Sequence, residues 1–162
     1  MRTAHVLAAA LSCAALIPAQ TASNVGLTMD GGTLTVLYGQ SCGAFTCQPF
    51  VAGPVGVGNA HRVYVYGAIQ QPYVLAIGLT NTAPCIPIPG LANSLILLGP
   101  VTLQVGLTAA PVLTSACPQA RDQYVLQFPV GTPIGVGFQL QALATSATQG
   151  PAFTIAIESV TG

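Results

Sequence analysis

The strongest structural signal in this chain of 162 residues is the segment Gly135-Val136-Gly137-Phe138-Gln139-Leu140-Gln141-Ala142-Leu143-Ala144. Successive side chains of a β-strand point to opposite faces, so Phe138 and Leu140 share an apolar face. Gln139 and Gln141 share the opposite face, which we expect to contact water. This alternation is typical of an antiparallel strand with one side on a core and one side in solvent.

Eight further segments show the alternation or the short apolar runs of β-strands. They are residues 25–29, 33–38, 62–69, 73–80, 94–98, 101–107, 123–128 and 153–159. Proline and glycine are frequent between them, and beyond the N-terminal stretch no segment has a helical period with capping residues. The pattern predicts an all-β fold: an antiparallel β-sandwich, Ig-like or jelly-roll-like, of about seven to nine strands.

The same alternation predicts the side chains of the core. In residues 153–159, the apolar positions face one way, whereas Thr154 and Glu158 face the solvent side. The expected core residues are Val63, Val65, Leu75, Ile77, Leu126, Phe128, Phe138, Leu140, Phe153, Ile155 and Ile157.

The N-terminal residues have the order of an export signal. Arg2 precedes an apolar run at 6–17, and small residues at 18–22 offer a cleavage site. The run is too short to span a bilayer. Ser12-Cys13 offers a lipoprotein cleavage box as the alternative, but the apolar run continues past Cys13, which favours secretion.

Three parts are therefore expected along the chain. A signal peptide with a signal helix occupies 1–22, a β-hairpin extension turning at Asp30-Gly31-Gly32 occupies 23–38, and the β-sandwich domain occupies 39–162. The predicted localisation is secreted, periplasmic or cell-surface, without a membrane anchor in the mature chain.

Charge is almost absent from this sequence. It has three Lys and Arg residues and three Asp and Glu residues, against 52% hydrophobic residues. This composition argues against a nucleic-acid partner, an anionic membrane surface and solvated disorder. Because surfaces near zero net charge tend to associate, the expected partners are a second copy of the chain, or an envelope protein or glycan.

Four cysteines remain after the signal: Cys42, Cys47, Cys85 and Cys117. An even number in an exported chain predicts two disulfides, with three alternative connectivities. A zinc site is the rival interpretation, but Cys85 and Cys117 have no neighbouring ligand residue. We therefore expect no metal and no other cofactor.

From Tyr38 onward, about three quarters of the chain resembles small secreted Gly/Pro-rich β-domains of planctomycete-type bacteria. The matching motifs are Tyr38-Gly39-Gln40-Ser41-Cys42, Ala83-Pro84-Cys85, Phe128-Pro129-Val130-Gly131-Thr132-Pro133, Phe138-Gln139-Leu140-Gln141-Ala142 and the closing strand 152–160. Cys47, Cys117 and the preceding hairpin depart from the family pattern. The resemblance implies a sandwich fold, an exported location, no catalytic activity of the module itself, and a Cys42–Cys85 disulfide that leaves Cys47 with Cys117. The local pair Cys42–Cys47, with Cys85–Cys117, is the second choice.

The sequence contains few residues that could form a catalytic site. Asp30 belongs to the expected hairpin turn, Asp122 follows Arg121 on a strand, and Glu158 lies on a solvent face, so none forms an evident acid–base pair. A hydrolase would have to use His61, which opens a strand where an exposed polar residue is ordinary. The expectation is that the protein is not an enzyme.

One surface feature is a candidate binding site: Arg62, Tyr64 and Tyr66 share one face of a strand, with Val63 and Val65 opposite. Tyrosine combines a flat apolar ring with a hydroxyl, which suits sugars or a protein partner. The competing interpretation is that the tyrosines cover a second core layer or the rim.

The sequence therefore predicts an exported, non-enzymatic structural or interaction module of the cell envelope or extracellular space. The alternatives are a carbohydrate-binding module that uses the tyrosine face, and a hydrolase that relies on His61.

Overall fold

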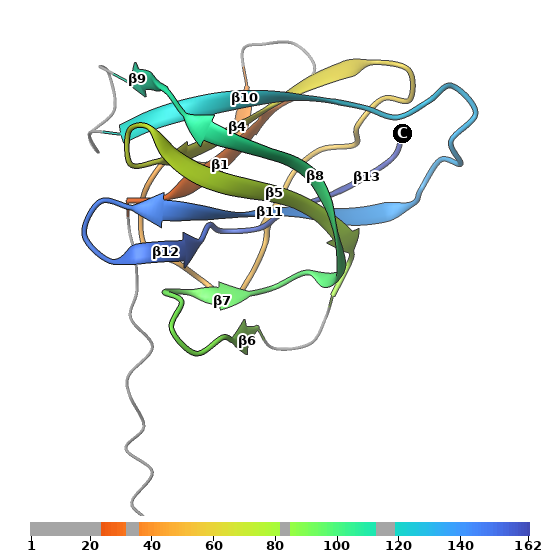
Figure 1. Cartoon of the computed structure of the whole chain (residues 1–162). Coiled ribbons are helices and arrows are strands. Elements are labelled where there is room, and N and C mark those ends of the chain that lie inside the picture. Colours follow the sequence, from red (N-terminus) through yellow and green to blue (C-terminus); the bar gives the residue numbers. More distant parts are fainter. Residues whose placement is uncertain (1–23, 32–35, 82–84, 113–118) are drawn as a thin grey trace, which may run out of the picture.

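The computed structural model describes residues 24–31, 36–81, 85–112 and 119–162, and these residues form thirteen strands and no helix (Figure 1). The first sheet has the order β2-β1-β4-β10-β9, with β1 (Gly26–Asp30), β2 (Leu37–Gln40), β4 (Ala60–Gly67), β9 (Ala110–Val112) and β10 (Gln119–Gln127). The second sheet has the order β3-β13-β11-β5-β8, with β3 (Phe50–Val51), β5 (Gln71–Leu79), β8 (Leu98–Thr108), β11 (Gly137–Ser146) and β13 (Ile157–Val160). β12 (Gly150–Phe153) pairs with β11, and β6 (Ile86–Pro87) and β7 (Ser94–Leu95) form a separate ribbon.

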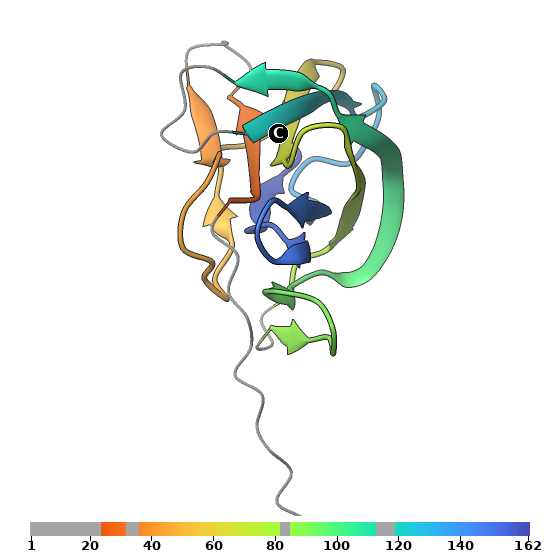
Figure 2. The same ribbon diagram turned by 60° about the vertical axis from the view of Figure 1, so that its left-hand side comes forward.

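The two sheets enclose one core. Leu27 and Val63 of the first sheet and Leu75 and Leu140 of the second are fully buried in the same apolar cluster. Within each of the two sheets, neighbouring strands pair antiparallel, and the one exception is the parallel pairing of β3 with β13. Figure 2 shows the layers from another side, with β8 curving along one border of the molecule. The predicted all-β sandwich is confirmed.

The N-terminal hairpin is built into the first sheet. β1 lies between β2 and β4, and its Leu27 and Met29 belong to the core. The loop between β1 and β2 is closed by a hydrogen bond from Gly31 N to Val36 O of 2.9 Å. The expected signal peptide at 1–22 and part of the second hairpin strand lie outside the described residues.

The predicted core residues are buried, with Ile77 and Phe128 partly buried against the same cluster. The Phe128 and Phe138 rings lie 5.0 Å apart between centroids. The strand expected at 153–159 is divided into β12 and β13. At the break, the Thr154 amide donates to Ala142 O (2.8 Å) and its hydroxyl accepts from Ala142 N (3.0 Å), which keeps the divided chain on β11.

The polar face of β11 was expected in water, and that prediction is wrong. Gln139 and Gln141 are completely buried. The Gln141 side chain accepts a hydrogen bond from Ile96 N (2.9 Å) and donates to Ser94 O (3.0 Å) and Thr154 O (2.9 Å). The chain around β7 therefore covers this face of the second sheet, and the amide supplies the hydrogen bonds that the covering backbone requires.

The expected disulfide pairings are also wrong, because Cys47 is bonded to Cys85 across 38 residues, with a Cα–Cα distance of 5.4 Å. The segments that follow the two cysteines both contact β12 or the residues just after it. Phe50 N, just after Cys47, donates to Ala156 O (2.8 Å), and the β6–β7 ribbon that follows Cys85 is held there by a bridge between Ala92 and Ala152. Cys42 is also disulfide-bonded. The prediction for Cys117 lies outside the described residues.

Replacing Gln141 with alanine should destabilise the fold strongly. The change leaves the three backbone groups bonded to Gln141 buried without partners, each costing about 1–3 kcal/mol. We expect a loss of at least about 2 kcal/mol in the free energy of unfolding from urea melts. The control is Gln123→Ala, an exposed glutamine of β10, which should stay within about 0.5 kcal/mol of wild type. Equal stability of the two variants would contradict the buried network.

Candidate functional site

β4 places the predicted binding residues as the alternation requires, on the outer face of the first sheet. Their exposure differs along the strand: Arg62 is exposed, Tyr64 is half-buried and Tyr66 is only 3% exposed. The Tyr66 hydroxyl lies 3.2 Å from the Thr28 hydroxyl in a buried hydrogen bond. Tyr66 is therefore part of the packed structure, and the accessible residues of the predicted site are Arg62 and Tyr64.

The neighbouring strand β10 adds a second arginine to this face. Cross-strand pairing sets Gln123 opposite Tyr64 and Val125 opposite Arg62. Arg121 lies diagonally across from Tyr64, and its guanidinium carbon is 4.8 Å from the centre of the tyrosine ring, in a cation–π contact. We call this surface the arginine face; it comprises Arg62, Tyr64, Arg121, Gln123 and Val125.

Sequence reasoning did not include Arg121 in the site. The local signal was present, because Arg121, Gln123 and Val125 alternate with the inward-facing Tyr124 and Leu126. What the sequence does not contain is the pairing of β4 with β10, which brings the two arginines onto one surface.

The acidic side chains of the chain all contact residues outside the arginine face. Asp30, Asp122 and Glu158 are its only acidic side chains, and all three are described. Glu158 accepts a hydrogen bond from Gln139 Nε2 at 2.7 Å. Among the described residues, the one contact within 4 Å between an acidic side chain and a His, Lys or Arg side chain joins Asp30 to His61. Neither arginine of the arginine face therefore has a carboxylate side chain as partner.

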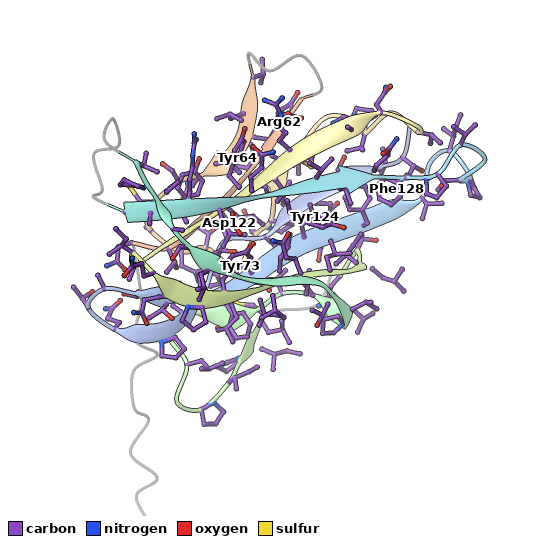
Figure 3. All side chains as sticks on the ribbon, turned by 45° about the horizontal axis from the view of Figure 1, so that its top comes forward. Arg62, Tyr64, Tyr73, Asp122, Tyr124 and Phe128 are labelled. Carbon is purple, nitrogen blue, oxygen red and sulfur yellow. A yellow bond between two sulfur atoms is a disulfide. The ribbon has the colours of Figure 1, made fainter. Side chains whose placement is uncertain are left out.

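Asp122 points into the sandwich, on the side of β10 opposite Arg121. Its carboxylate accepts a hydrogen bond from the Tyr73 hydroxyl of β5 (2.8 Å), and Gln104 Nε2 of β8 lies 3.4 Å away. In Figure 3, Arg62 and Tyr64 lie above β10, whereas Asp122 and Tyr73 lie below it. Burial, reinforced by the hydrogen bond and charge of Asp122, raises the pKa of Tyr73 well above its usual range. The pair joins the two sheets.

His61 and Asp30 form an unexpected buried pair. We expected His61 to be exposed and Asp30 to sit in a turn, but each is only 3% exposed, with His61 Nδ1 3.6 Å from Asp30 Oδ1. The correction follows from the register: His61 shares the inward face of β4 with Val63, and Asp30 ends the adjacent strand β1. Among the described residues, buried His61 Nε2 has no hydrogen-bond partner, so none of them stands at the nucleophile position of a Ser-His-Asp arrangement.

The border of the second sheet is the other prominent surface. β8 is its outermost strand, eleven residues long, and among the described strands it pairs only with β5. Leu98, Val101, Val105 and Leu107 are all more than half exposed. The strand contains no charged residue. A mainly apolar hollow of about 270 Å³ lies beside β8. It is lined by Val101 of β8 together with Phe128, Phe138 and their neighbours.

Searches for relatives give no family. The chain has no match among protein-family models, curated proteins or solved structures. Across the described ranges, no three His, Cys, Asp or Glu side chains gather into a group able to hold a metal ion. No helix in the described part of the chain has the length and apolar character of a membrane span. The candidates are therefore the arginine face and the edge of β8.

The link between Tyr73 and Asp122 predicts a loss of stability in alkali. Tyr73 stays protonated in the folded protein above pH 10, where an unfolded tyrosine ionises, so the folded state holds the extra proton. The contribution of the Tyr73 hydroxyl to the free energy of unfolding is complete below pH 10. Above pH 10 this contribution falls by up to about 1.4 kcal/mol per pH unit.

Urea melts from pH 8 to pH 11 should show this fall in wild type and a shallower fall in Tyr73→Phe, which lacks the titrating hydroxyl. The other tyrosines are present in both proteins, so their ionisation does not affect the comparison. Identical slopes would contradict the raised pKa.

Proposed function

We propose that this protein is an exported, non-enzymatic structural or interaction module of the cell envelope or extracellular space, which associates with copies of itself through β8. The observation that carries the proposal is the free edge of β8, an uncharged strand with exposed apolar side chains. The Cys47–Cys85 disulfide supports an oxidising compartment, as does the signal-like N-terminal sequence.

An unpaired strand edge presents rows of backbone N–H and C=O groups that bind another strand. Natural edges are commonly protected by lysine, proline or bulges. In β8 the protection is confined to the first half, where Pro100 removes one donor and the pairing with β5 shifts register on either side of Ala76 and Ile77. From Gln104 to Leu107 the register is regular, and this is the part available for pairing, whereas Thr108 is buried.

A second copy of the chain is the occupant that fits this edge best. Two β8 strands that pair antiparallel about a two-fold axis present the same surface to each other, as a two-fold dimer requires. No charge on the strand opposes the contact, and the net charge of the chain is zero. Val105 and Leu107 of both copies would then lie side by side on one face of a continuous sheet.

A lysine at position 105 should prevent this association. We expect wild type to pass from monomer to dimer between micromolar and near-millimolar concentration in sedimentation equilibrium. Val105→Lys should remain monomeric, because two lysines would meet across the two-fold axis at the edge.

The matched control is Val130→Lys, since Val130 is 89% exposed but lies in a loop, compared with 68% for Val105. This variant should associate like wild type. A wild-type protein that is monomeric throughout the range, or equal behaviour of the two variants, would overturn the proposal.

Glycan recognition by the arginine face is a second candidate function. It is favoured by a separate observation, the two unpaired arginines beside Tyr64, and it shares no residue with β8.

A further inference from the structure

We propose that the arginine face binds an acidic polysaccharide, with carboxylate or sulfate groups of the ligand on Arg62 and Arg121. The inference rests on the second candidate function and is independent of association through β8. It assigns the chemical class of the ligand, which the sequence and the fold class alone do not give.

The first support is the separation of charge in a nearly uncharged protein. The chain has three arginines and no lysine, and the two arginines beyond the signal-like segment stand on this one face. The three carboxylates are directed elsewhere: Asp30 to His61, Asp122 into the sandwich and Glu158 to Gln139. The face is therefore locally positive although the chain is neutral overall, and it complements an anionic ligand.

The second support is the orientation of Arg121. Its guanidinium carbon lies over the ring of Tyr64, 4.8 Å from the ring centre. The guanidinium group carries N–H donors along its edge, and these match the two oxygens of a carboxylate or sulfate. Because the side chain is already held, less conformational entropy is lost when it binds.

The third support is the spacing and chemistry of the surface between the arginines. Arg62 lies opposite Val125, four residues along β10 from Arg121, an offset of about 13 Å at 3.3 Å per residue. An extended polymer with repeated negative groups can reach both positions. Between them, Gln123 offers an amide that suits hydroxyl groups, and Tyr64 offers the exposed part of its ring.

These features favour a polysaccharide over an acidic protein. The centre of a protein–protein interface is enriched in exposed aromatic and apolar side chains. Here the ring of Tyr64 is half-buried beneath Arg121, and Val125 is the one aliphatic side chain of the arginine face.

Calorimetry with short charged oligomers tests the proposal. The probes are oligogalacturonates for carboxylate, sulfated dextran oligosaccharides for sulfate, neutral dextran oligosaccharides, and oligoglutamate as an acidic peptide. Oligomers too short to bridge two protein copies keep avidity out of the measurement. We expect binding to at least one acidic oligosaccharide, weakening with added salt, and none to the neutral one.

Arg62→Gln and Arg121→Gln should each weaken binding about tenfold, and the double variant should abolish it. Arg121→Lys keeps the charge but loses the planar group, so it should bind less tightly than wild type. These residues lie on the surface, so thermal unfolding and sedimentation should stay unchanged.

The matched control separates a site from net charge. Two lysines at exposed loop positions, Val130→Lys and Ile134→Lys, added to the double arginine variant restore the total charge away from the face. Binding should not return. The proposal is overturned if wild type binds no acidic oligosaccharide, if the arginine variants bind like wild type, if the relocated lysines restore binding, or if oligoglutamate binds as tightly as the sugars.

Discussion

Burial of β11 on both faces is the constraint on which the rest of the structure depends. Its apolar face, with Phe138 and Leu140, closes the core between the sheets. Its polar face is covered by the chain around β7, which the Gln141 amide holds by two hydrogen bonds, and a third hydrogen bond joins the amide to Thr154 O. The covering chain continues at Leu98 into β8, which pairs with β5 on the side away from β11. The same packing that seals the sheet therefore makes β8 its outer edge.

The scarcity of charge has a second consequence for the surface. Each carboxylate lies against a partner within the fold, and the Tyr73–Asp122 hydrogen bond joins one sheet to the other. Asp122 and Arg121 are neighbours in sequence, so strand geometry directs one inward and the other outward. Because Asp122 is directed inward, Arg121 has no carboxylate partner and contacts the ring of Tyr64 instead. A positive face results in a chain whose net charge is zero.

Local alternation was sufficient to predict most of the longer strands and the core, because the pattern around Phe138, Leu140 and Val63 shows which face of each strand is apolar. It did not predict the short strands β3, β6 and β9. It could not show what covers a face. Gln141 looked like a solvent residue because its cover, at Ser94 and Ile96, lies more than forty residues away in sequence. The same limit explains the disulfide and the His61–Asp30 pair, which depend on which strands are neighbours. Two of the five residues of the arginine face, Arg62 and Tyr64, could be predicted, whereas the three on β10, including Arg121, required the pairing of β4 with β10.

The two proposed surfaces have different chemistry: β8 offers backbone groups and apolar side chains, and the arginine face offers fixed positive charge. An assembly that joins copies through β8 would present the arginine face repeatedly, which suits an extended polymeric ligand. Association through β8 is the central claim of this account, and hydrogen exchange read by mass spectrometry tests it most directly. Raising the protein concentration should slow exchange of the amides in residues 104–107, while β2, an edge strand of the first sheet, exchanges at an unchanged rate. Exchange in β8 that does not depend on concentration would contradict the account.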